Sequence, residues 1–145
     1  MSFGFSVGDF LAASKLINDI VSALRHSSVS SYQELVRELH GLERALHQVE
    51  HLPCPPGQEA QVNAVKAMAL AVQYPLNEFA AKLSKFERLD IRHSNVHVPT
   101  ISDKAKGWGR KVQWGIVMEE DVAKLRTHIA AHVGSLNIRL STLGL

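Results

Sequence analysis

The sequence predicts an all-α fold: an up-and-down four-helix bundle with a kinked third helix and an extra short tryptophan-bearing helix. Long segments carry apolar residues at three- and four-residue spacing, which is the period of a helix with one buried face. Short serine- or proline-rich breaks separate most of these segments, and the alternating pattern of strands is nearly absent. With 145 residues, 46% of them hydrophobic and 21% charged, the chain suits a single folded domain over residues 1–145.

The first helix is expected over residues 6–28. Ser6 is followed three residues later by Asp9, which is a variant of the capping pattern that marks a helix start. The residues that follow form one broad apolar stripe: Phe10, Ala13, Ile17, Ile20, Val21 and Leu24. This spacing predicts an amphipathic helix with unusually few charges.

The second helix is expected over residues 32–52, after a short polar break. Ser31 and Glu34 have the spacing of a capping box. The apolar stripe alternates steps of four and three residues, as in the seam of a helical bundle: Leu35, Leu39, Leu42, Leu46 and Val49. The prolines of 53-PCPPG-57 cannot continue a helix, so a rigid turn is expected there.

The third helix is expected from Gln58 to about Arg88. Pro75 lies inside its pattern and predicts a kink or break near Gln73, because proline lacks an N–H donor and clashes with the preceding turn. The stripe consists of Val62, Val65, Ala69, Val72, Leu76, Phe79, Leu83 and Phe86. Periodicity is lost over residues 89–106, which predicts one long loop.

The C-terminal part predicts a short helix over residues 106–117, followed by a last helix over residues 119–143. Three acids open the last helix, a favourable place near its positive end. Its stripe consists of Val122, Leu125, Ile129, Val133, Leu136, Leu140 and Leu143. Gly144 is placed to end it.

Sequence motifs for enzyme chemistry are absent. The chain has no G-x-S-x-G turn and no glycine-rich phosphate loop, and Cys54 lies in a proline loop with no evident base. Two histidine pairs have the i, i+4 spacing of metal ligands on one helix face, His47 with His51 and His128 with His132. Neither pair forms an H-E-x-x-H motif or has a third ligand identifiable from the sequence. We therefore expect no enzyme activity, cofactor or metal, and interpret the histidines as surface or boundary residues.

The stretch 104-KAKGWGRKVQWG-115 concentrates cations and tryptophans in a chain that is poor in aromatics. It predicts a basic-aromatic rim suited to an anionic surface: Lys104, Lys106, Trp108, Arg110 and Lys111. The competing interpretation makes the tryptophans fillers of the bundle corner. We favour this for Trp114, and for Trp108 both interpretations stay open. Nucleic acid is not expected, because four clustered cations and a net charge of +2 fall short of a basic face.

The N-terminal segment contains more apolar residues than one core face needs. Phe3, Phe5, Phe10, Leu11 and Leu16 extend beyond the stripe, and the bundle core, a membrane or a second protomer can cover them. Asp9, Lys15 and Asp19 interrupt the stretch, so no membrane-spanning helix is expected. No signal peptide is recognisable, which predicts a cytoplasmic protein.

Both ends of the chain resemble one family. The opening 1-MSFGFSVGDFLAASKLINDIVSAL-24 and the segment 108-WGRKVQWGIVMEEDVAKLRTHIAAHVGSLNIRLSTL-143 resemble the fungal N-terminal domain of NLR-like (STAND) and ubiquitin-like-domain proteins, which is related to HeLo-like domains. The resemblance implies a helical bundle at the N-terminus of a larger protein, where oligomerisation drives membrane association and cell death. The membrane or self-association role then falls on Phe3, Phe5, Phe10, Leu11, Leu16, Ile17 and Ile20.

The function expected from the sequence is therefore that of a non-enzymatic signalling or effector module. Its expected partners are copies of itself, downstream domains of the same protein and, after activation, an anionic membrane. The alternative is a protein-binding adaptor or regulatory bundle without membrane activity, which would use the second helix or the tryptophan corner.

Overall fold

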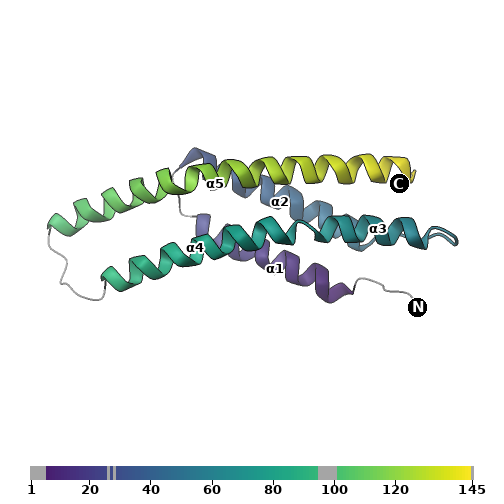
Figure 1. Cartoon of the computed structure of the whole chain (residues 1–145), viewed down its shortest axis with the longest axis horizontal. Helices are drawn as coiled ribbons and strands as arrows, with labels where there is room; N and C mark the ends of the chain where they lie inside the picture. Colours follow the sequence, from purple (N-terminus) through teal and green to yellow (C-terminus); the bar gives the residue numbers. More distant parts are fainter. Residues whose placement is uncertain (1–5, 26, 28, 95–100, 145) are drawn as a thin grey trace.

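The computed structural model describes residues 6–25, 27, 29–94 and 101–144, and the side-chain surroundings of these residues apart from 86–117. The fold is an all-α, up-and-down four-helix bundle, in which α3 and α4 together form the bent third helix (Figure 1). Helix α1 packs against α2 and α4, and α5 packs against α2, α3 and α4. The later part of α4 and the first part of α5 project beyond α1 and α2 (Figure 1).

Helix α1 spans Val7–Leu24 and begins where the sequence predicts. The backbone N–H of Ser6 donates to Oδ2 of Asp9 at 2.8 Å, and the N–H of Asp9 donates to the carbonyl oxygen of Ser6 at 3.0 Å. These bonds satisfy backbone groups that a helix start otherwise leaves open. The Ser6–Asp9 pattern is thus confirmed as the start of the first helix.

Helix α2 spans Ser30–Glu50, and the expected capping box of Ser31 and Glu34 is wrong. Val29 occupies the cap position, where its carbonyl oxygen accepts from the N–H groups of Tyr32 and Gln33 at 3.1 and 3.2 Å. Ser31 is therefore already helical, and its Oγ is buried with no hydrogen-bond partner. The Glu34 carboxylate instead contacts α5.

Helices α3 (Glu59–Leu70) and α4 (Gln73–Ser94) confirm the kink predicted from Pro75. The helix is interrupted at residues 71–72, immediately before the turn that contains the proline. Ala71 lies four residues before Pro75, so its carbonyl has no proline N–H to accept from and instead accepts from the N–H of Tyr74 at 3.3 Å. The break therefore follows directly from the chemistry of one residue.

Helix α5 spans Ile101–Thr142 and combines two expected elements. The tryptophan-bearing segment is helical, as predicted, but it runs without a break into the last helix. The long loop expected over residues 89–106 is wrong for 89–94 and 101–106, which are helical, and 95–100 lie outside the described residues. An apolar period indicates that one face of a helix is buried, so its loss does not exclude a helix. Neither of the two helical stretches contains a proline that would interrupt a helix. Gly144, with φ of 73°, follows the end of α5 as expected.

The core lies along the shared axis of the helices and contains the predicted stripes. All six stripe residues of α1 are buried, as are all five of α2. The third stripe is buried from Val62 to Leu83, while the side chain of Phe86 lies outside the described residues. In α5, Val133, Leu140 and Leu143 are only partly buried. Tyr32 joins the core fully buried, and burial raises its pKa to about 12 with a smaller contribution from Glu119.

Candidate functional site

Helix α1 divides the predicted self-association residues between the core and the surface. Phe10, Ile17 and Ile20 are buried, and Leu16 is partly buried against the core. Among the described members of the set, only Leu11 is well exposed, with 62% of its surface accessible. Phe3 and Phe5 lie outside the described residues. Within the residues that the structure describes, the accessible part of the predicted surface is thus the side of α1 that carries Leu11.

Val7 accompanies Leu11 on that side of the helix. It lies four residues earlier, so the two side chains occupy one face, and Val7 is 63% exposed. We call this pair the N-terminal apolar edge. The start of α4 packs beside it, because Nε2 of Gln73 donates to the carbonyl oxygen of Asp9 at 3.2 Å. The next residue, Tyr74, is also exposed, so the neighbouring helix contributes a further large apolar side chain near this end of the bundle.

The basic-aromatic rim of Lys104, Lys106, Trp108, Arg110 and Lys111 lies on the first part of α5. Its helical backbone is described, whereas the surroundings of its side chains are not. The same holds for Trp114. Both interpretations of the tryptophans therefore stay predictions.

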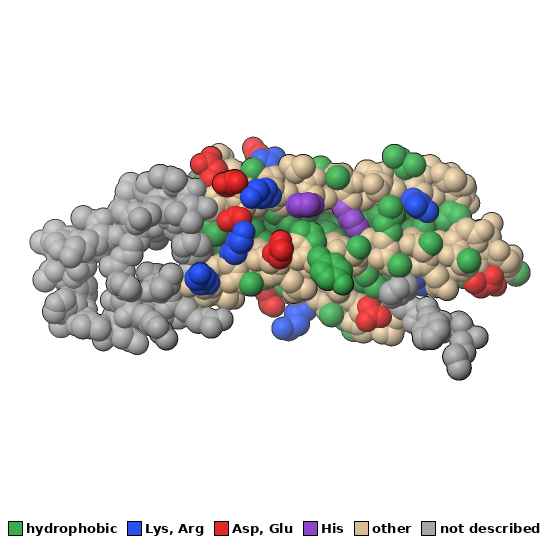
Figure 2. Space-filling model, viewed as in Figure 1, with side chains coloured by type: hydrophobic (Ala, Val, Ile, Leu, Met, Phe, Trp, Pro, Cys, Tyr) green, Lys and Arg blue, Asp and Glu red, His purple; other side chains and the backbone are tan. Residues whose placement is uncertain are grey.

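An apolar groove separates α3 from the end of α5. Its volume is about 540 Å³, and its lining includes Ala60, Ala64, Val65, Ile138 and Leu143. Ile138 is 70% exposed beside this groove. Figure 2 shows hydrophobic side chains along the seam between α5 and the bent α3–α4 helix. Sequence periodicity did not identify this feature, because Ile138 falls outside the predicted stripe.

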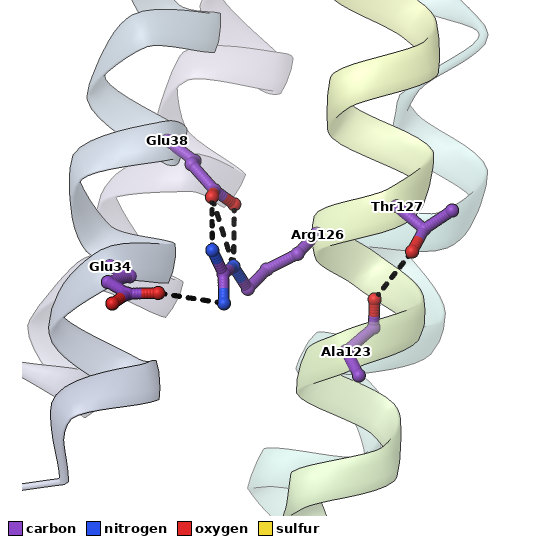
Figure 3. A network of polar contacts seen from close by, with 5 residues as sticks. All are labelled: Glu34, Glu38, Ala123, Arg126 and Thr127. Carbon is purple, nitrogen blue, oxygen red and sulfur yellow. Dashed lines mark hydrogen bonds and ion pairs between the residues drawn. The ribbon is translucent and has the colours of Figure 1, made fainter.

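A network of ion pairs ties α2 to α5 (Figure 3). Nε of Arg126 donates to both carboxylate oxygens of Glu38 at 3.0 and 3.1 Å, and Nη2 lies 2.9 Å from Glu38 Oε1. Nη1 of the same side chain lies 2.9 Å from Oε2 of Glu34. This arrangement holds α5 against α2.

The histidine pairs have different surroundings. His132 is partly buried, and its Nε2 lies 3.0 Å from the carbonyl oxygen of Ala69 on α3. Burial lowers the pKa of His132, although the bond to Ala69 acts in the opposite direction. His128 is exposed. His47 and His51, by contrast, lie together at the end of α2 with Glu50 between them.

No described helix is long and apolar enough to cross a bilayer. In comparisons with family models, curated proteins and solved structures, the chain has no match. The resemblance to the fungal N-terminal domain therefore remains a prediction made from the sequence.

Proposed function

We propose that this chain is a non-enzymatic signalling or effector module, carried at the N-terminus of a larger protein, that acts by self-association and is recruited from the cytoplasm to an anionic membrane on activation. The observation that carries the proposal is the N-terminal apolar edge. Helix α1 buries its own stripe and still presents Val7 and Leu11 outward. Exposed apolar side chains grouped on one helix face are suited to contact with another apolar surface.

The burial of the α1 stripe determines which surface acts first. Releasing α1 would expose five large apolar side chains, Phe10, Ile17, Ile20, Val21 and Leu24. At about 1.5–3 kcal/mol each, this would cost roughly 8–15 kcal/mol, which is comparable to the stability of a whole domain. We therefore propose that copies of this chain first associate through the N-terminal apolar edge. Any release of α1 onto a membrane then follows only when assembly offsets the free energy of exposing the α1 stripe.

The test compares two variants in which an exposed leucine or isoleucine is replaced by glutamate, one on α1 and one on α5. Leu11→Glu disrupts the N-terminal apolar edge, and Ile138→Glu introduces the same charge at a similarly exposed position on α5. Size-exclusion chromatography with light scattering measures self-association, and co-sedimentation with anionic and neutral vesicles measures lipid binding. We expect Leu11→Glu to reduce both, and Ile138→Glu to behave as wild type. A wild-type protein that stays monomeric and binds neither anionic nor neutral vesicles would refute the proposal.

The adaptor function is the second candidate, and the groove between α3 and α5 favours it. An apolar groove with the exposed Ile138 at its side is suited to an apolar segment of a protein partner. In that case Ile138→Glu would abolish a one-to-one complex with the partner. Leu11→Glu would leave the complex intact, so the same two variants separate the candidates.

A further inference from the structure

Three metal-ligating side chains meet at the last turn of α2. His47, Glu50 and His51 each offer one donor atom, and these atoms lie within 4.8 Å of one another. The imidazole rings of the two histidines have their centroids 4.3 Å apart. Oε2 of Glu50 is 4.0 Å from Nδ1 of His47 and 3.9 Å from Nδ1 of His51. Within the described residues, no other group of three such side chains is this close.

A backbone hydrogen bond selects the ring nitrogen that His51 can offer. Its Nδ1 lies 2.9 Å from the carbonyl oxygen of His47, and a carbonyl oxygen can only accept. Nδ1 therefore carries the hydrogen, and in the neutral ring the lone pair is on Nε2. Histidine ligands in metal sites are commonly oriented by such a bond from the second nitrogen. His51 thus already has the tautomer and the support of a ligand that binds through Nε2.

The geometry requires only side-chain movement to close around an ion. Donors bound to tetrahedral zinc at about 2.0–2.1 Å lie about 3.3 Å apart, which is closer than the separation of up to 4.8 Å between the donor atoms here, so the side chains have to rotate to bring Nε2 of His51 and the other two donors together. The side chains of His47 and His51 are 72% and 63% exposed, and their rotation displaces no core residue. The Glu50 carboxylate and the negative end of the α2 dipole both favour a cation at this position.

We propose that His47, Glu50 and His51 form a binding site for one divalent transition-metal ion of the zinc class. Two imidazoles and one carboxylate suit Zn²⁺ better than Mg²⁺ or Ca²⁺, which prefer oxygen ligands. Three protein ligands leave a fourth position for water. The sequence alone predicted no metal here, since it identified a histidine pair without a third ligand, and Glu50 supplies that ligand.

His40 provides a matched control on the same helix. Its Nδ1 lies 3.8 Å from Oε2 of Glu43, so it repeats the histidine–glutamate pair of His47 and Glu50. The position that corresponds to His51 is Arg44, which cannot ligate a metal. Replacing His40 therefore removes an equivalent surface histidine without changing the proposed ligand set.

The test is a calorimetric titration of the tag-free chain with ZnCl₂. We expect saturable binding of one ion, weakened at least tenfold in His51→Asn and several-fold in Glu50→Gln. His40→Asn and Cys54→Ser are expected to bind as wild type. Circular dichroism confirms that each variant is folded. Absence of one-to-one binding, equal loss in His40→Asn, loss in Cys54→Ser, or full affinity in His51→Asn would each overturn the proposed site. None of these outcomes depends on self-association or lipid binding.

Discussion

Replacing Arg126 with alanine should weaken the bundle by more than an ordinary surface ion pair does. This side chain joins α5 to two glutamates of α2, Glu34 and Glu38, with four contacts of 2.9–3.1 Å. Glu34 and Glu38 lie one helical turn apart, so without the guanidinium their like charges repel each other by a few tenths of a kcal/mol. The substitution thus removes an attraction and also uncovers a repulsion.

The magnitude follows from the exposure of the partners. The side chains of Arg126 and Glu38 are 35% and 34% exposed, so water screens their attraction. Two such pairs contribute about 0.2–1 kcal/mol each, and the lost packing of the arginine stem adds to this. We expect Arg126→Ala to lower the free energy of unfolding by about 1–2 kcal/mol. For a chain of this length, the melting temperature should fall by about 3–6 °C.

Lys124 is the control for this experiment. Its Nζ lies 3.1 Å from Oε1 of Glu120, but both residues belong to α5 and both are well exposed. Lys124→Ala should cost at most about 0.5 kcal/mol. Urea denaturation followed by circular dichroism measures both variants, and 1 M NaCl should narrow the difference between them. A loss for Arg126→Ala no larger than for Lys124→Ala, or no coupling with Glu38→Gln in a double-mutant cycle, would refute this reasoning.

Three further predictions concern single side chains. Gly57→Ala should destabilise the protein by about 1 kcal/mol, because φ is 87° at this position. Gly134→Ala should stabilise the protein by about 0.5–1 kcal/mol, because the new methyl group would lie in open space on α5. Denaturation midpoints that shift in the same direction for both variants would contradict this prediction. Leu39→Ala should cost about 2–5 kcal/mol, since the side chain is fully buried, and a loss below 1 kcal/mol in urea would argue against the described core. Because the pKa of His132 is lowered in the folded protein, the unfolded chain binds a proton at this residue more readily, and the free energy of unfolding should fall as the pH drops below the ordinary pKa of 6.5. His132→Gln should make the pH dependence of the denaturation midpoint shallower. The same pH dependence in the variant and the wild type would count against this prediction.

Local chemistry along the chain determined most of the architecture. The stripes of α1 and α2 predicted their core residues, because the side chains that share a helix face are three and four residues apart. The Ser6–Asp9 pair and Pro75 act within one turn of their own positions, so a start and a break could be predicted from them. The missed cap at Ser31 shows the limit of such patterns, since the helix began before the expected residue.

Only the tertiary structure decided which residues remained accessible and which partners met. Leu11 and Leu16 both lie outside the predicted stripe of α1, yet the fold leaves Leu11 exposed and partly buries Leu16 against the core. Arg126 reaches Glu38 across 88 positions of sequence, and His132 reaches Ala69 across 63. Such contacts depend on how one helix is placed against another. Periodicity within a single helix gives its buried face and contains no information about that placement.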